Sequence, residues 1–159
     1  MTALPEDLSQ AVFRYFPVAR LAVIAADGAP EVMPIVFAET GSFLYSPIDG
    51  KPKKSARLKR LDAITNHPRV GLVLDHFAAD WTQLWWIKLS CVASIIGEVD
   101  DGFAGAESAL RAKYPQYQTT PLFKGEPTMI RFEIVEQKWW GATGVDAIRD
   151  WVGANLSVT

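Results

Sequence analysis

Apolar residues recur at two different spacings along the chain, and each spacing predicts a different kind of element. Near the N-terminus they recur every three or four positions, which predicts a short helix over about 4–16 that ends at Pro17. The same spacing predicts a helix that begins at Ser55, a suitable N-cap, and ends before Pro68. A third helix is predicted over 103–114, where the next residue is again a proline.

Six further segments are rich in β-branched and aromatic residues, and we expect each to form a strand. Asp27-Gly28 joins the first two and predicts a tight two-residue hairpin, because both turn residues must accept a positive φ. The fifth segment exceeds the usual strand length, so we expect it to bend or to pair with a second chain. The strands cover 20–26, 29–38, 42–46, 70–76, 83–99 and 129–138, and the apolar face of the fifth consists of Trp85, Ile87, Leu89, Cys91, Ala93 and Ile95.

The order of these elements indicates a mainly β protein of the α+β class. Strands follow one another as hairpins, helices are inserted between some of them, and no Gly-x-Gly-x-x-Gly turn is present. We therefore expect an antiparallel β-barrel over about 18–140 with flanking helices, in one domain that covers 1–159. The segment 152–159 is predicted to be poorly ordered.

Composition narrows the class of protein further. Hydrophobic residues make up 49% of the chain, with six Trp and eight Phe, which is typical of a protein with a packed core. No apolar run approaches the roughly 20 residues that span a bilayer, and the N-terminus lacks a basic signal-peptide region, so we expect a cytoplasmic protein. Cys91 is the only cysteine, which excludes a disulfide within the chain.

Few residues suit conventional catalytic or metal chemistry. The stretch 75–81, DHFAADW, places His76 between two carboxylates, but its spacing matches no metal-ligand motif, and no metal site is predicted. The other histidine, His67, precedes a proline at a helix end, where a cap or an exposed position is expected. Gly-x-Ser-x-Gly and Walker motifs are absent, so the sequence offers no residues for a classical hydrolase or kinase.

Positive charge is concentrated in one short segment. Six of the sixteen Lys and Arg residues lie within 51–60, where no acidic residue occurs, although the net charge of the chain is −2. The segment leads into a predicted helix N-terminus, whose free N–H groups and positive dipole end favour a bound phosphate. Two alternatives stay open, a solvated charged helix face and a nucleic-acid contact. The six residues are Lys51, Lys53, Lys54, Arg57, Lys59 and Arg60.

Aromatic pairs and one proline complete the candidate features. The two Trp-Trp pairs, at 85–86 and 139–140, are expected in the core, in an interface, or against a flat ligand. Pro34 interrupts a strand pattern and removes one ladder donor. The strand is therefore an edge there, or contains a bulge, or has a ligand beside it.

The order of these features resembles the pyridoxamine 5′-phosphate oxidase-like superfamily, the split β-barrel flavin and deazaflavin oxidoreductases. More narrowly, it is similar to the branch of coenzyme F420-dependent enzymes. The resemblance covers roughly residues 5–140 and rests on three segments, RLAVIAADGAPEVMPIVF at 20–37, YSPIDGKPKKSARLKRLDAITNHPRVGLVLDHF at 45–77 and DWTQLWWIKLSCVASI at 80–95.

The resemblance implies an FMN-binding type of split barrel with six strands, which works as a homodimer with two cofactor sites at the subunit interface. The cofactor phosphate would then be held by Lys51, Lys53, Lys54, Ser55 and Arg57, foremost among them Lys54 and Arg57. The tricyclic ring would lie beside Met33, Pro34, Ile35 and Val36, and Trp85 or Trp86 of the partner subunit would close the pocket.

These residues lead to one functional hypothesis with two alternatives. The first is a homodimeric oxidoreductase that uses coenzyme F420, the first choice, or FMN, and exchanges a hydride with a small conjugated substrate. The second is a non-catalytic carrier of a flavin or tetrapyrrole, and the third is nucleic-acid binding through 51–60. No catalytic residue is assigned. The C-terminal Trp and Arg arrangement of true pyridoxamine phosphate oxidases is absent, so that activity is not expected.

Overall fold

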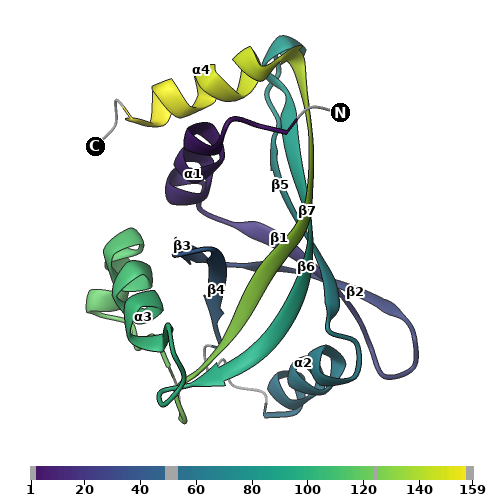
Figure 1. Ribbon diagram of the computed structural model, residues 1–159, viewed down its shortest axis with the longest axis vertical. Helices are drawn as coiled ribbons and strands as arrows, with labels where there is room; N and C mark the ends of the chain where they lie inside the picture. The colour runs from purple at the N-terminus through teal and green to yellow at the C-terminus, as the bar shows by residue number, and fades with distance from the viewer. Residues whose placement is uncertain (1–2, 49–53, 124, 157–159) are drawn as a thin grey trace.

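In the computed structural model, one antiparallel sheet forms the centre of the molecule (Figure 1). Residues 3–48, 54–123 and 125–156 are described, with the backbone alone for 54–58. The strand order is β2-β1-β5-β6-β7-β4-β3, which confirms the predicted mainly β, antiparallel architecture. The strands are β1 (Ala19–Ile24), β2 (Pro30–Ile35), β3 (Ala38–Thr40), β4 (Phe43–Pro47), β5 (Arg69–His76), β6 (Trp85–Gly97) and β7 (Thr128–Gly144).

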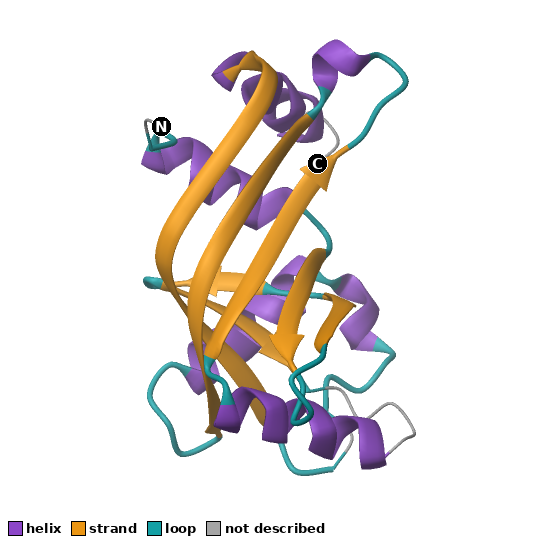
Figure 2. Ribbon diagram, turned by 90° about the vertical axis from the view of Figure 1, so that its right-hand side faces the viewer, coloured by secondary structure: helices purple, strands orange, loops and turns teal. Residues whose placement is uncertain are grey.

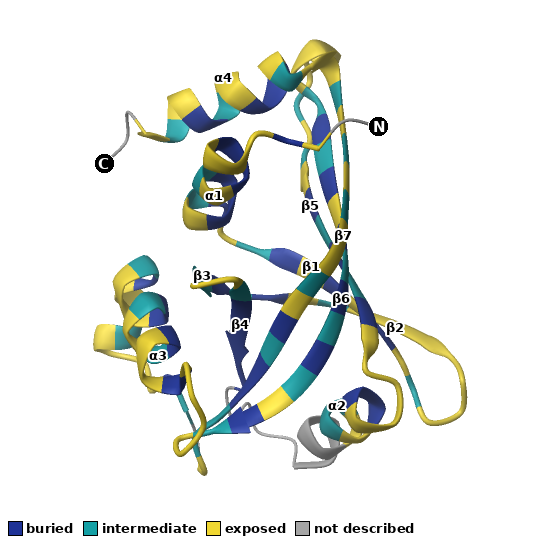
Figure 3. Cartoon of the chain, in the orientation of Figure 1, coloured by how far each residue is buried: buried dark blue, intermediate teal, exposed yellow. Residues whose placement is uncertain are grey.

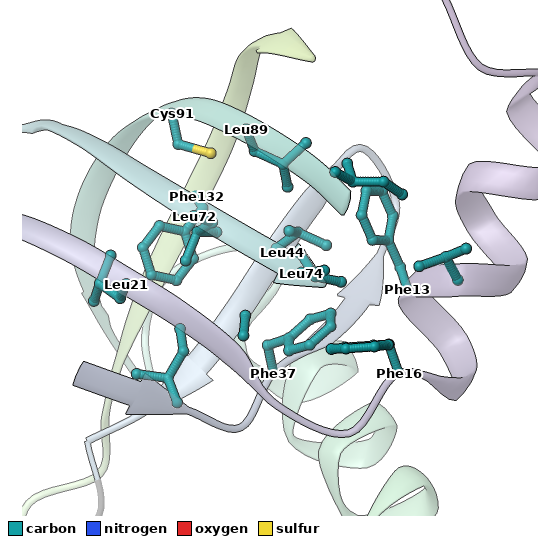
Figure 4. Packing of buried hydrophobic residues seen from close by; sticks show 14 of the residues in the cluster. Phe13, Phe16, Leu21, Phe37, Leu44, Leu72, Leu74, Leu89, Cys91 and Phe132 are labelled. Carbon is teal, nitrogen blue, oxygen red and sulfur yellow. The ribbon is translucent and has the colours of Figure 1, made fainter. Parts of the chain in front are cut away.

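Helices lie on both sides of this sheet, and their packing produces two hydrophobic clusters (Figures 1 and 3). The larger cluster fills the inner side of the sheet and includes residues of α1, α2 and α4, and Figure 4 shows part of it. The smaller cluster lies between α3 and residues of β3, β4, β6 and β7. The helices of the described residues are α1 (Glu6–Tyr15), α2 (Lys54–Asn66), α3 (Phe103–Lys113) and α4 (Val145–Leu156), with short 3-10 turns η1 (Trp81–Gln83) and η2 (Pro115–Gln118).

The predicted second strand, 29–38, is in fact two strands. β2 ends at Ile35 on one edge of the sheet, and β3 begins at Ala38 on the opposite edge. Phe37 lies between them, and its backbone leaves the strand ladder. The Tyr114 hydroxyl replaces that ladder, because it accepts from the Phe37 N–H at 3.0 Å and lies 2.9 Å from the Phe37 carbonyl oxygen. The predicted six strands therefore become seven in the described chain.

The first hairpin also differs from its predicted form. β1 and β2 pair as expected, but the last pair is Ile24 with Pro30, and the Ala25 N–H donates to the Ala29 carbonyl. The loop therefore has three residues rather than two, and among the described residues only glycines have a positive φ, here Gly28 at 83°. A three-residue loop needs one left-handed residue instead of two, which is why Asp27 keeps an ordinary conformation.

The two longest strands, β6 and β7, form the spine of the sheet (Figure 2). Ser90 pairs with Glu136 while Cys91 pairs with Ile134, so Val135 is an extra residue in β7. This bulge lies in β7 and not in the predicted fifth segment, β6, so the bend or intermolecular pairing expected of that segment stays a prediction. The predicted apolar face of β6 is buried from Trp85 to Ala93, whereas Ile95 is 36% exposed at its end.

The C-terminal prediction is wrong for 152–156. This segment belongs to α4, whose Ile148 and Val152 are buried against β7 and α1. The spacing of these residues is helical, but β7 continues to Gly144, six residues past its predicted end at 138. The sequence contains no clear break between the two elements, so the helix was missed. Residues 157–159 lie outside the described part of the chain.

We expect that Tyr114→Phe lowers the free energy of unfolding by about 1–3 kcal/mol, because it leaves the buried backbone of Phe37 without its partner. Urea unfolding followed by tryptophan fluorescence measures the loss. Tyr15→Phe is the matched control, since no hydrogen bond of the Tyr15 hydroxyl is found within the described residues. Equal stability of the two variants would contradict this role of Tyr114.

Candidate functional site

The N-terminus of α2 is the first part of the candidate site. The helix begins at Lys54, so Ser55 lies inside its first turn and the predicted N-cap is two residues too late. That turn also contains Arg57 and holds no acidic residue. Lys51 and Lys53 lie outside the described residues. Free N–H groups, the positive end of the helix dipole and basic residue types therefore coincide at one place in the chain.

The second half of α2 anchors the helix to the barrel. Ala63 and Ile64 are buried in the larger hydrophobic cluster, and Leu61 packs against it. The helix contacts β1 and β6 and lies under the lower end of the sheet in Figure 1. Lys59 of the second turn is exposed. Hydrophobic burial at the C-terminal half thus holds the helix against the barrel.

The second part of the candidate site is the edge strand β2. β2 pairs with β1 and with no other strand of the described chain, which confirms the edge alternative for Pro34. Pro34 is exposed, Met33 and Val36 are half-buried, and Ile35 is buried in the core. An edge strand presents unpaired N–H and C=O groups, which a planar heterocycle can use as hydrogen-bond partners. These residues therefore suit contacts through the backbone rather than through polar side chains.

The third part is the outer face of the sheet. The strand pairing places Trp86, Val73, Ala22 and Val32 on this face, at successive strands from β6 to β2. Figure 2 looks onto this side, and in the upper part the long strands lie in front of the helices. The exposed apolar residues of the face include Ile24 at 40%, Val32 at 67% and Trp140 at 44%.

The structure separates the two tryptophans that were predicted to close the pocket. Trp86 lies on the outer face, half-buried, with the Lys88 ammonium 4.4 Å from its ring centroid. Trp85 points to the opposite side, is 1% exposed, and packs against Phe16 and Trp151. Its Nε1–H has no acceptor among the described residues. Only Trp86 is therefore placed where a second molecule can reach it.

The cysteine and the histidines have structural surroundings. Cys91 is fully buried, and this burial raises the pKa of its thiol to about 12, which keeps it protonated and unreactive. His76 stacks on Trp85, and His67 is exposed at the end of α2. These positions agree with the packing and end-of-helix interpretations rather than with catalysis.

The stretch 75–81 forms a turn rather than a ligand cluster. The Asp80 carboxylate accepts from the Thr82 N–H at 3.0 Å and from its hydroxyl at 2.7 Å, and these bonds lower the pKa of Asp80. Asp75 is paired with Arg20 at 3.8 Å. Within the described ranges, no group of three or more His, Cys, Asp and Glu residues is arranged to hold a metal ion.

Sequence reasoning missed one buried polar side chain in the barrel. Ser46, at the end of β4, is 3% exposed, and its pairing with Ile130 places it on the inner face of the sheet. A serine within an otherwise apolar strand could have indicated a buried hydroxyl. The residue type alone, however, does not distinguish a buried serine from an exposed one near the end of a strand.

Comparisons with known proteins show what this fold is similar to. No family model matches the chain, and no curated protein matches it. Solved structures do match, among them HutZ, the heme storage protein of Vibrio cholerae, at 16% identity and a TM-score of 0.64 over 89% of this chain and 95% of that chain.

Two further matches are named for flavin or pyridoxamine phosphate chemistry. A FAD-binding protein of Mesorhizobium loti has 18% identity and a TM-score of 0.62, over 86% of this chain and 92% of that chain. A Listeria innocua protein provisionally named a pyridoxamine 5′-phosphate oxidase has 17% identity and a TM-score of 0.59, over 84% and 96%. These matches confirm the predicted split-barrel fold, while their low identity leaves function open.

A membrane-spanning helix is not found among the described residues, since none of their helices combines the length and the apolar character that a bilayer requires.

The different positions of the two tryptophans have measurable consequences for stability. We expect that Trp85→Ala lowers the free energy of unfolding by about 3–5 kcal/mol, because it opens a cavity in the core. Trp86→Ala, at the outer face, should cost about 1 kcal/mol or less. Thermal and urea unfolding of both variants provide the comparison, and similar losses would show that the two rings have been assigned to the wrong faces.

Proposed function

We propose that the chain acts as a homodimeric oxidoreductase that binds a phosphate-bearing tricyclic cofactor and acts on a small conjugated substrate. Coenzyme F420 is the first choice and FMN the second. The observation that carries this proposal is the first turn of α2, which starts at Lys54, contains Ser55 and Arg57, and has no acidic residue. An anion is stabilised there by the dipole and by charge-assisted hydrogen bonds.

The residue types around this turn fit such a cofactor. The phosphate would be held by Lys51, Lys53, Lys54, Ser55 and Arg57. The side chain of coenzyme F420 carries further negative charge, which Lys51 and Lys53 would neutralise. The free edge of β2, at Met33–Val36, would hold the ring through backbone groups. When bound, the cofactor supplies the hydride carrier, and the chain contributes binding, orientation and exclusion of water.

A carrier function is the second candidate. The match to HutZ covers nearly the whole of both chains, and that protein is named for heme storage rather than for catalysis. A non-catalytic carrier of a flavin or tetrapyrrole would use the same edge strand and the same open face. Turnover of a reductant with a panel of conjugated acceptors distinguishes the two, because a carrier retains its ligand without consuming the reductant.

The decisive experiment is a titration of the purified protein with FMN and with coenzyme F420, followed by quenching of tryptophan fluorescence. We expect Lys54→Ala to weaken binding of the preferred cofactor about tenfold to a hundredfold, since one charge-assisted contact is lost, with little change in Tm. Lys59→Ala, one helical turn further along α2 and exposed, is the matched control and should bind normally.

Three outcomes would alter this assignment. Equal weakening by Lys54→Ala and Lys59→Ala would indicate a general charge effect. Binding of neither cofactor would leave only the fold in common with the flavin proteins. Retention of single-stranded or duplex nucleic acid, with an affinity that falls steeply as salt rises, would favour the nucleic-acid alternative.

The homodimer is proposed to form through the outer face of the sheet. Exposed apolar side chains from β1, β2 and β7 share this face with charges of both signs, including Lys88 and Glu136. A second copy of the chain could bury the apolar groups and pair opposite charges across a two-fold axis. Trp86 would then extend toward the cofactor site of the partner subunit.

We expect Ala22→Glu to shift the protein from dimer to monomer, because it introduces a charge into the middle of the apolar part of this face. Ala22 is exposed in the single chain, so the substitution should leave the monomer folded. Val99→Glu is the control, since Val99 is 97% exposed in the turn after β6. Size-exclusion chromatography with light scattering measures the mass, and an unchanged dimer in Ala22→Glu would locate the interface elsewhere.

A further inference from the structure

A separate cavity of about 570 Å³ lies between α1, β3 and α3. It shares no residue with the proposed cofactor site, and in Figure 1 these elements lie on the opposite side of the molecule from β2 and α2. Five polar side chains line it, Gln10, Arg14 and Tyr15 from α1, Glu39 from β3 and Lys113 from the end of α3. An amine, a carboxyl group and a guanidinium group therefore line one cavity that is open to solvent on one side.

The amine of Lys113 is held in a defined position. Its Nζ donates to the Phe13 carbonyl oxygen at 2.7 Å, at the C-terminal end of α1 where carbonyls lack helical partners. The same nitrogen lies 3.7 Å from the centroid of the Phe37 ring. Within the described residues, no ion pair joins Lys113 to Glu39. The amine is thus fixed at the cavity wall without being neutralised by a direct carboxylate contact.

Burial controls the charge of this group. It lowers the pKa of Lys113 to about 7, while the nearby Glu39 acts in the opposite direction. Burial also raises the pKa of Glu39. The negative charge of Glu6 raises this pKa further, and the positive charge of Lys113 lowers it. Tyr114, next to Lys113, has its pKa raised to about 12 by burial and stays neutral. Near pH 7 a large fraction of Lys113 is therefore the neutral, nucleophilic amine.

We propose that this cavity is a carbonyl-binding site in which Lys113 forms an imine with a small aldehyde that carries a carboxylate. Arg14 is the residue on the cavity wall that can hold the carboxylate of such a molecule. Glu39 is the residue that can move protons during the reaction. The site is independent of the proposed oxidoreductase function, since neither its residues nor its chemistry involves the cofactor.

The reaction balances without an oxidant or a reductant. The lone pair of the neutral Lys113 amine attacks the carbonyl carbon, the C–N bond forms, and the proton lost from nitrogen goes to the carbonyl oxygen. The hydroxyl group of this carbinolamine then leaves as water, with a proton that Glu39 relays from solvent, as the C=N bond forms. The remaining N–H proton returns to solvent through the Glu39 carboxylate, so that amine and aldehyde give imine and water.

Reductive labelling tests the proposal directly on the wild-type protein. The folded chain is incubated at pH 7 with glyoxylate and cyanoborohydride, and carboxymethylated lysines are quantified by peptide mass spectrometry. We expect Lys113 to be labelled at least about tenfold faster than the exposed Lys59, because burial lowers the pKa of Lys113 to about 7 and leaves much of this amine in its neutral, nucleophilic form at pH 7. Labelling of the urea-unfolded chain should abolish this preference.

Variants separate the role of each group. Arg14→Gln should slow labelling by glyoxylate severalfold but leave labelling by uncharged propionaldehyde unchanged. Glu39→Gln should slow both reactions. Lys113→Arg keeps a donor for the Phe13 carbonyl, and it should remove the fast-labelled site while the slow sites remain.

The pH profile gives a second, independent readout. The rate at Lys113 should level off above about pH 7, where most of this amine is neutral. The charged or titratable groups around Lys113 in the described residues are Arg14, Tyr15 and Glu39 on the cavity wall and Tyr114 beside it in the chain, while Glu6 acts on Glu39. Labelling of Lys113 at the rate of the exposed lysines, or a rate insensitive to folding, would overturn the proposal.

Discussion

The hydroxyl group of Tyr114 lies where the chain passes from one end of the sheet to the other. Its neighbours are the backbone of Phe37, between β2 and β3, and the carbonyl oxygen of Pro17, just before β1, at 2.9 Å. A sheet that closes on itself must leave a few backbone groups without strand partners, and a buried group of this kind is costly. The Tyr114 hydroxyl accepts from the Phe37 N–H, and its single proton can be donated to either the Phe37 or the Pro17 carbonyl, so this side chain joins the end of α3 to both halves of the barrel.

The way the sheet closes into a barrel explains which of its edges and faces stay exposed. β2 keeps a free edge because the chain leaves it at Val36, and the helices α1, α2 and α4 contribute to the core on the inner side. α3 covers part of the outer side, at the ends of β6 and β7. What remains is the outer face with Trp86, adjacent strand by strand to the edge that carries Pro34. The edge at β2 and the open outer face are therefore products of the same topology.

The sequence predicted the elements that have a strong period and missed those whose limits depend on tertiary contacts. Alternation along 85–93 and the proline after 103–113 located β6 and α3 correctly. The break at Phe37 could not be predicted, because Tyr114, 77 residues away, creates it. The basic segment was correctly linked to a helix N-terminus, although α2 begins at Lys54 and so contains most of that segment. A pattern of residue types cannot reveal a burial such as that of Lys113, which depends on α1 and β3.

The extra residue Val135 sets the phase of side-chain alternation along β7. Before it, Phe132 and Ile130 point inward; after it, the inward positions are Gln137 and Trp139, while Trp140 lies on the outer face beside Trp86. Even-numbered residues thus change sides at a single point. A lineage that lost this one residue would retain the whole hydrophobic composition of the strand, yet Trp139 and Trp140 would exchange their surroundings. The number of residues in β7 therefore decides which of its side chains reach the outer face.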